Sequence, residues 1–411
     1  MIKSVSTHDV RFQMPEGSGS DAVHSNPEYS YAVTLLETDG HTGSGSTFTL
    51  GAGNDIVAQL ANQLADRMLQ LGGRDIEEIM SRFGEIQKAL ADDPQLRWLG
   101  PHKGAIHLAL ASVTNAAFDL WARARGLPLW KLLLDLSDAE VVALLDLSWI
   151  EDSLTRDQAL ELLTQERSTR DSRSGILKTG YPGYDTSVGW FGYSDEAIAE
   201  NARVAREQGF RAMKLKVGSS ELETDLRRFR IVRDVVGDDA LLMVDANQQW
   251  TWPAADRACK AFAELGAYWI EEPTHPDDVV GHGRLARILR PLGVRLALGE
   301  HVSHRVLFKN FIEANAVDIV QVDALRVAGV SEFLAVSMMA RKAGLSVIPH
   351  VGDMGQLHQH LVLFNHIALG LPAEMLEYIP HLSHHFLDPA IVRDGVYVTP
   401  TAVGGGLALR Y

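Results

Sequence analysis

The sequence predicts an α/β protein in which a modified, TIM-like (β/α)-barrel carries an N-terminal α+β capping domain. The main observation is a series of polar residues, each at the end of an apolar run, along the second half of the chain. They are Lys216, Asp245, Glu271, Glu300, Asp323, His350 and Glu377. The steps between them are 29, 26, 29, 23, 27 and 27 residues, and one strand, one helix and two loops take about 30 residues. The spacing therefore predicts a parallel β/α repeat.

Two further observations support the barrel. The apolar runs of the repeat, such as Leu241–Val244, lack polar alternation, as parallel strands buried on both faces do. The first 135 residues lack the repeat and therefore form a separate unit in the prediction. Because acids and bases at the strand ends of a barrel are typical of catalysis, the pattern predicts an enzyme.

The predicted capping domain covers residues 1–135. Its predicted strands are Val5–Phe12, Tyr31–Glu37 and Gly43–Leu50. Apolar residues at helical spacing predict a first helix with one face formed by Ile56, Leu60, Leu64 and Met68. A second helix is predicted over Ile106–Arg123. The loop 14–29 is long enough to cover a substrate, and His24 within it is either a substrate contact or a solvated side chain.

A connector, residues 136–185, precedes the predicted barrel, residues 186–387. The connector contains a run with the pattern of a strand, Val141–Ile150. Ser194 and the two acids after it predict the start of a helix, because Ser caps helices and acids favour the first turn. The tail, residues 388–411, is predicted to pack back on the capping domain.

Composition excludes several classes of function. The chain has 411 residues, of which 46% are hydrophobic and 22% charged, as in globular proteins of more than one domain. The net charge of −15 argues against nucleic-acid binding, which needs clustered Lys and Arg. We expect no membrane partner, because no charge-free stretch reaches spanning length. A single cysteine, Cys259, and the lack of a signal-peptide pattern lead us to expect a cytoplasmic protein.

Asp245, Glu271 and Glu300 end three successive predicted strands. Three carboxylates in one site repel one another unless a cation neutralises them, and oxygen-only ligands suit Mg²⁺. We therefore predict a Mg²⁺ site, in place of the alternative in which each acid caps the next helix. Glu272 is left out because strand alternation would turn it to the opposite face. Asn247 either contacts metal or substrate or only forms a turn.

Lys214 and Lys216 lie on one face of a predicted strand, because side chains alternate along it. Two neighbouring ammonium groups lower each other's pKa, which leaves one of them able to act as a base. The alternative is a solvated pair at a strand edge. It is disfavoured because the residues around the pair have the pattern of barrel core.

His350 and Asp323 end adjacent predicted strands. An Asp beside an imidazole fixes its tautomer and raises its basicity, so we predict a catalytic His–Asp dyad. Six other histidines lack convergent spacing, and we expect them at the solvated surface. They are His358, His360, His366, His381, His384 and His385.

A base, a dyad and a carboxylate-bound metal between them can together remove a proton α to a carboxylate. The metal offsets the charge of the enediolate that forms, and the base contributes a factor of about 10²–10⁴. Protonation of a leaving hydroxyl then gives dehydration. Return of the proton gives racemisation or epimerisation.

These residues resemble the mandelate racemase branch of the enolase superfamily, and several stretches resemble its L-fuconate dehydratases. The stretches are Asp21–His24, Gln95–Pro101, Gly180–Pro182, Gly192–Asp195, Trp269–Pro273, Pro276–Asp278, Glu377–Tyr378 and His381–Phe386. The resemblance implies a capped barrel with bound Mg²⁺ that dehydrates a small acid sugar to a 2-keto-3-deoxy acid. It also implies a symmetric homo-oligomer.

By this resemblance Lys216 removes the C2 proton and His350 protonates the departing 3-hydroxyl. Lys214 holds the substrate carboxylate, and Glu377 lies at the distal end of the enediolate site. The sequence departs from the family pattern in three loops at the mouth of the barrel, which leaves the substrate open. These loops are His301–His304, Ala324–Leu325 and Val351–Gly355.

The sequence therefore predicts a Mg²⁺-dependent hydro-lyase with L-fuconate as its first candidate substrate. L-Galactonate, D-arabinonate or an aldarate is the nearest alternative, followed by a racemase or epimerase with the same site. A non-catalytic binding protein is the alternative from another class. It is disfavoured because every catalytic position is present.

Overall fold

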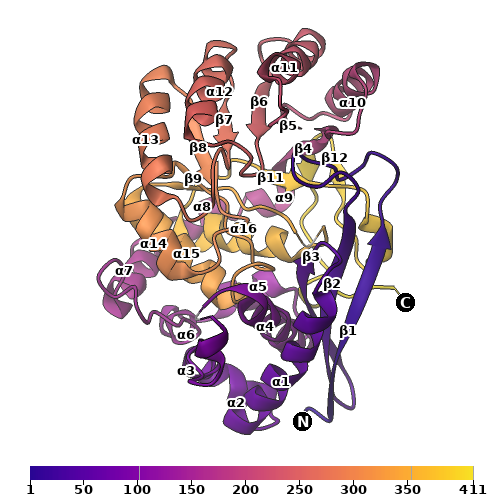
Figure 1. The fold of residues 1–411 in the computed structure, drawn as a ribbon. Helices are drawn as coiled ribbons and strands as arrows, with labels where there is room; N and C mark the ends of the chain where they lie inside the picture. The colour runs from indigo at the N-terminus through magenta and orange to yellow at the C-terminus, as the bar shows by residue number, and fades with distance from the viewer. Residues whose placement is uncertain (101, 353, 411) are drawn as a thin grey trace.

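The structure, a computed structural model, describes residues 1–100, 102–352 and 354–410. Pro101 of the stretch Gln95–Pro101 and Asp353 of the loop 351–355 lie outside the described residues. Figure 1 shows the purple helices of the N-terminal part at the bottom of the view and its indigo strands along the right side, with helices α10–α13 of the barrel at the top. No helix within the described residues has both the length and the hydropathy to cross a membrane.

The N-terminal part is an antiparallel three-stranded sheet packed against helices, which confirms the strands predicted there. The strands are β1 (Ser4–Gln13), β2 (Glu28–Glu37) and β3 (Thr42–Thr49). The helices are α1 (Asn54–Gly72), α2 (Ile76–Ser81), α3 (Phe83–Ala91), α4 (Gly104–Ala124) and α5 (Leu129–Asp135). Helix α4 confirms the helix predicted over Ile106–Arg123 and packs against β3.

The predicted face of α1 is wrong at its first position. Ile56 is 55% exposed, and the buried face is formed by Val57, Ala61, Leu64 and Met68. A series of residues four apart turns by about 40° per step around an α-helix, because the helix has 3.6 residues per turn. Ile56 therefore lies well to the side of the face that Met68 buries.

Eight parallel strands follow, and their order confirms the predicted barrel fold. They are β4 (Tyr181–Gly189), β5 (Ala212–Lys216), β6 (Leu241–Asp245), β7 (Trp269–Glu271), β8 (Arg295–Leu298), β9 (Ile319–Val320), β10 (Ser346–Val347) and β11 (Leu376–Tyr378). Each strand from β5 to β10 pairs in parallel with the one before it, and β11 returns to pair with β4. The register aligns Lys216 with Asp245 and Asp245 with Glu271.

Helices lie between the strands, as the repeat predicts. They are α10 (Asp195–Glu207), α11 (Leu222–Val236), α12 (Trp252–Glu264), α13 (Val279–Leu289), α14 (Arg305–Glu313), α15 (Val330–Ala343) and α16 (Leu357–Leu369). Ser194 caps α10 by accepting a hydrogen bond from the Ala197 N–H, as predicted. The helices cover the outside of the sheet, so the ends of the strands remain accessible for a functional site.

The strand predicted over Val141–Ile150 is wrong. Only residues 141–143 of this run are helical, and residues 144–150 form turns and irregular backbone. The α-helices of the connector are α6 (Asp138–Ala143), α7 (Arg156–Gln165), α8 (Arg170–Arg173) and α9 (Ile176–Thr179). Ser137 and Glu140 form a capping box that starts α6. This local signal accounts for the helical start of the run, residues 141–143, but not for the irregular backbone that follows.

The segment after the barrel contacts both parts of the molecule. The hairpin β12 (Val392–Arg393) and β13 (Val396–Tyr397) pairs with β4, which begins within the segment 136–185. Further on, the Gly405 N–H donates to Asp119 of α4 at 2.6 Å. The tail therefore ties the first barrel strand to the N-terminal part.

One layer of apolar side chains closes the inside of the barrel. It takes one residue from, or next to, each of the eight strands: Tyr184, Ala212, Met243, Trp269, Ala297, Ile319, Ile348 and Met375. Ala212 precedes Lys216 by four residues on β5, so this layer lies below the polar strand ends. This apolar layer closes the barrel beneath the polar strand ends.

Candidate active site

The seven polar residues of the repeat meet at the carboxyl end of the barrel. Lys216, Asp245 and Glu271 are the last residues of β5, β6 and β7. Glu300, Asp323 and His350 lie two or three residues beyond β8, β9 and β10, and Glu377 lies within β11. The barrel therefore positions each side chain on its own strand or on the loop that directly follows it.

Asp245, Glu271 and Glu300 form what we call the acid cluster. Each offers one carboxylate oxygen, and these oxygens all lie within 4.8 Å of one another. The three residues are at most 8% exposed. Burial, together with the charge of Asp245, raises the pKa of Glu271 to about 8, although Lys214 opposes the shift.

The acid cluster fits a divalent cation such as Mg²⁺. Its ligands are oxygens only and come from three separate strands, as hard cations prefer. Asn247 lies beside the cluster, with its side-chain nitrogen 3.2 Å from Glu300 Oε1. Its buried Oδ1 has no hydrogen-bond partner among the described residues. Asn247 also forms a turn, at φ 41°. The residue therefore both forms the predicted turn and lies where it could contact a metal or a substrate.

The two lysines contact the carboxylates rather than each other. Lys214 Nζ is buried between Glu271 at 2.6 Å and Glu377 at 2.9 Å. Lys216 Nζ lies 2.5 Å from Asp245 and is 13% exposed toward the cavity. Burial lowers the pKa of both lysines, but the neighbouring carboxylates raise it further, so both values lie above the usual range. The predicted lowering of the lysine pKa is therefore wrong when the carboxylates beside the lysines hold no cation. A cation on the acid cluster would offset part of the rise in pKa that these carboxylates cause.

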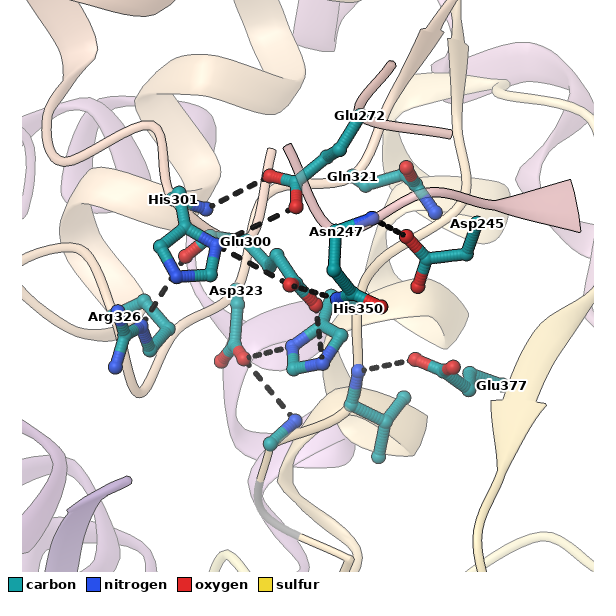
Figure 2. A network of polar contacts seen from close by, with 12 residues as sticks. Asp245, Asn247, Glu272, Glu300, His301, Gln321, Asp323, Arg326, His350 and Glu377 are labelled. Carbon is teal, nitrogen blue, oxygen red and sulfur yellow. Dashed lines mark hydrogen bonds and ion pairs between the residues drawn. The ribbon is translucent and has the colours of Figure 1, made fainter. Parts of the chain in front are cut away.

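His350 lies between two carboxylates, as Figure 2 shows. Its Nδ1 is 2.7 Å from Asp323 Oδ2, and its Nε2 is 2.9 Å from Glu300 Oε2. Burial lowers the pKa of His350, but Glu300 and Asp323 together hold it well above the usual range. Nδ1 donates to Asp323, which leaves Nε2 to exchange a proton on the side of the acid cluster.

A cavity of about 240 Å³ opens over these groups. The barrel contributes Lys216, Asn247, Glu300, His301, Arg326 and His350 to its lining. The N-terminal part contributes Gly19, Asp21, His24, Tyr29, Phe48, Thr49 and Leu50. Residues of the predicted loop 14–29 therefore form part of one wall, although the loop ends at residue 27 and Tyr29 belongs to β2. The His24 side chain is 37% exposed, and its Nδ1 lies 3.0 Å from Asp21 Oδ2.

Glu272 differs from its prediction. Its backbone turns to φ 42°, so strand alternation ends at Glu271 and the Glu272 side chain lies close to His301. Glu272 Oε2 is 3.4 Å from His301 Nδ1, which is also 3.2 Å from Glu300. The sequence of the strand contains no pattern that predicts this left-handed turn. It brings Glu272 beside the acid cluster.

Sequence reasoning assigned no site role to Asp21, His301 or Arg326, which line the cavity. Arg326 donates through Nε to the Glu300 carbonyl at 3.2 Å and through Nη1 to the Phe48 carbonyl at 2.9 Å. It therefore joins β3 to the loop that carries Glu300. Their position in the sequence could have identified His301 and Arg326. Both follow closely after predicted site residues at strand ends, Glu300 and Asp323.

The expectation of six solvated histidines holds only for His384, because His366, His381 and His385 are partly buried and two more are fully buried. His358 and His360 in α16 are both 0% exposed. Helix α16 is buried on nearly all sides, so helical position alone did not imply solvent. His384, by contrast, is exposed.

Comparison with known families divides the chain in two. Residues 7–133 match the N-terminal domain of the mandelate racemase and muconate lactonizing enzymes. Residues 197–410 match the enolase C-terminal domain-like family. The second match alone covers more than half of the chain.

Similar proteins match over nearly the whole length. L-galactonate dehydratase from Hypocrea jecorina is 40% identical, over 100% of this chain and 92% of that relative. The crystal structure of human mitochondrial enolase superfamily member 1 has a TM-score of 0.95 at 40% identity and covers 100% of this chain and 94% of the other.

A third similar structure contains magnesium. The L-talarate/galactarate dehydratase of Salmonella typhimurium, bound to Mg and L-lyxarohydroxamate, has a TM-score of 0.76 at 27% identity. The match covers 100% of this chain and 90% of that one. A magnesium-bound relative agrees with an acid cluster that could hold a metal ion.

Proposed function

The chain belongs to the enolase superfamily, with the mandelate racemase and muconate lactonizing enzymes, and we propose that it dehydrates a sugar acid with the help of Mg²⁺. Relatives named as dehydratases of acid sugars support the reaction class. The expected product is a 2-keto-3-deoxy acid.

The placement of Lys216 and His350 carries this proposal. Lys216 ends β5 and His350 follows β10, and four strands separate β5 from β10 in the order of the sheet. Both nevertheless reach the same acid cluster, Lys216 through Asp245 at 2.5 Å and His350 through Glu300 at 2.9 Å. A substrate bound at the cluster would therefore meet one proton-transferring group from each side of the barrel.

Asp245, Glu271 and Glu300 would hold the cation. When bound, Mg²⁺ supplies Lewis-acid stabilisation for the negative charge that develops on the substrate carboxylate. Lys214, fixed between Glu271 and Glu377, would donate to the same carboxylate. Asn247, which lines the cavity, would contact the substrate or the cation shell.

The proton transfers follow from these positions. Lys216 removes the proton from C2, and the electron pair of that bond moves into the carboxylate to give an enediolate. His350 Nε2 then protonates the hydroxyl on C3, so that the C3–O bond breaks and water leaves. Asp323 keeps its charge and holds the imidazolium through Nδ1. The resulting enol tautomerises to the ketone.

L-Fuconate is the first candidate substrate. It is the 6-deoxy form of L-galactonate, the acid in the name of the Hypocrea jecorina relative, so the two share their configuration up to C5. The wall from β3 and its flank is partly apolar, with Phe48 and Leu50. An apolar wall favours a terminal methyl over a hydroxyl, which supports L-fuconate over L-galactonate.

A substrate panel tests the proposal. The purified enzyme is incubated with Mg²⁺ and L-fuconate, L-galactonate, D-arabinonate or galactarate, and 2-keto-3-deoxy product is measured with semicarbazide. We expect turnover with L-fuconate as the best substrate and no turnover after removal of the metal with EDTA. A different leading acid would keep the reaction and correct the substrate.

Two results would contradict the proposal. Exchange of the C2 proton with solvent deuterium, without a keto product from any acid, would assign the site to a racemase or epimerase. Neither exchange nor product, with Mg²⁺ bound, would assign it to a binding protein.

A further inference from the structure

His358 is a buried histidine that the reaction steps above do not use. It lies in the first turn of α16 and is 0% exposed. Its ring packs edge-on against Phe333 of α15, with 5.9 Å between the ring centres. A histidine in such surroundings is stabilised only by polar partners, so the contacts of its ring nitrogens define its role.

Asp323 is a charged partner of His358. His358 Nε2 lies 3.2 Å from Asp323 Oδ1, whereas His350 Nδ1 lies 2.7 Å from Asp323 Oδ2. The two imidazoles therefore contact different oxygens of one carboxylate. Figure 2 shows the His350 side of this arrangement.

Backbone donors complete the surroundings of Asp323. The Leu325 N–H donates to Oδ1 at 2.7 Å, and the Gly352 N–H donates to Oδ2 at 3.1 Å. Asp323 itself is 0% exposed. Among the described residues, each oxygen thus has a backbone N–H and an imidazole beside it, and these contacts hold the plane of the carboxylate.

The same nitrogen of His358 also contacts the backbone next to Asp323. The Ala324 N–H lies 3.0 Å from His358 Nε2. A neutral ring with an unprotonated Nε2 accepts from this N–H, and an imidazolium donates from Nε2 to Asp323. In both forms the ring holds the segment 323–325 against α16.

We propose that His358 is a positioning residue for the Asp323–His350 pair, an inference that rests on the proposed dehydration. By fixing Asp323 from the side opposite His350, it keeps Nδ1 of His350 hydrogen-bonded and Nε2 directed at the acid cluster. His358 contacts Asp323 rather than the cavity lining, so it acts through Asp323 and not on the substrate.

The chain offers a matched control in His360. It lies on the same helix and is equally buried, at 0% exposure. Its Nδ1 accepts a hydrogen bond from the Trp130 N–H of α5 at 3.2 Å. Replacing His360 therefore removes a buried imidazole from α16 without removing a contact of Asp323.

Kinetics separate positioning from a general loss of structure. We expect His358→Leu to lower kcat for dehydration about 10- to 100-fold, as loss of a group that orients a catalytic histidine does. KM stays unchanged, and exchange of the C2 proton in D₂O stays near wild type because it depends on Lys216. His358→Gln, whose amide can still donate to Asp323, recovers most of kcat, and His360→Leu does not lower it.

A spectroscopic measurement needs no substrate. In enzyme labelled with ¹⁵N-histidine, we expect the His350 Nδ1–H to give a downfield resonance in wild type and in His360→Leu. In His358→Leu this resonance broadens through faster exchange with water. His358→Met, which lacks the same polar contact in a more flexible side chain, replaces the leucine variant if that variant does not fold.

Two results would overturn the proposal. One is an unchanged His350 resonance in His358→Leu or His358→Met. The other is an equal loss of dehydration and C2 exchange, since a structural defect affects both. If wild-type enzyme dehydrates no acid, the proposed function fails, and the resonance still decides whether His358 positions Asp323.

Discussion

Asp185 illustrates how burial sets the charge of a single side chain. It lies in β4 at 6% exposure, and burial raises its pKa to about 6, although Ser187 donates to it. The unfolded chain releases this proton near pH 3.8. Between about pH 4 and 6 the folded state therefore binds more protons, so stability falls as the pH rises through this window.

Asp185→Asn should stabilise the protein at neutral pH. A shift of about two pKa units corresponds to a gain of up to about 3 kcal/mol at pH 7.5, which shrinks toward pH 4. Urea unfolding at pH 5.0 and pH 7.5 measures this difference. The exposed Asp135→Asn serves as the control, and equal effects of Asp185→Asn at both pH values would contradict the account.

The polar strand ends were predictable at the level of single residues, because each ends an apolar run at the spacing of the repeat. The surroundings of these residues were not. Glu272 contacts His301 because its backbone makes a left-handed turn, and His358 contacts Asp323 from α16, the helix that follows β10. Such contacts depend on how separate segments meet in space, which no local pattern records.

At the scale of elements, the close approach between β3 and α4 holds the sheet and the helix of the N-terminal part together. A Cβ at Gly45 would lie 2.1 Å from the Ala116 nitrogen and 2.3 Å from the Ser112 carbonyl oxygen. Both are backbone atoms of α4, so the helix would have to move. The missing side chain at Gly45 therefore sets the distance between strand and helix.

Gly45→Ala should destabilise the protein by about 1–3 kcal/mol or more, as overpacking of a close contact does. Gly40→Ala is the matched control in the turn between β2 and β3, because a Cβ there meets nothing within 4 Å. Its effect should stay within about 0.5 kcal/mol. Urea unfolding compares the two, and equal losses would contradict the packing argument.

The element scale also shows where patterns mislead. Strand β6 (Leu241–Asp245) matches its predicted range, Leu241–Val244, closely, since parallel strands buried on both faces have continuous apolar runs. In the connector, the apolar run Val141–Ile150 had the composition of a strand, yet the capping box at Ser137 starts a helix. That helix ends at Ala143, and the rest of the run forms turns, so the apolar composition of the run did not predict its structure.

At the scale of the whole molecule, the barrel and the N-terminal part share one core. A single apolar cluster contains Val33 and Phe118 from one part and Leu325 and Phe333 from the other. Tyr31 Oη donates to the Gly352 carbonyl at 3.1 Å across the same boundary. The loops that carry the Asp323–His350 pair are therefore supported by the N-terminal part.

This shared core predicts one cooperative unfolding transition whose midpoint rises with Mg²⁺. At a concentration 100 times the dissociation constant, binding to the folded state adds about 2.7 kcal/mol. Differential scanning calorimetry with and without Mg²⁺ measures both effects. In Glu271→Gln, which removes one acid of the cluster, Mg²⁺ should no longer raise the midpoint; two separate transitions would contradict the shared core.

We propose that Lys216 removes the C2 proton while His350 completes elimination. The most direct test is NMR of the C2 proton of L-fuconate with Mg²⁺ in D₂O, for wild type, Lys216→Ala and His350→Asn. We predict keto product with wild type, deuterium at C2 without product with His350→Asn, and neither with Lys216→Ala, although both variants still bind Mg²⁺. Deuterium exchange by Lys216→Ala at the wild-type rate would contradict the account.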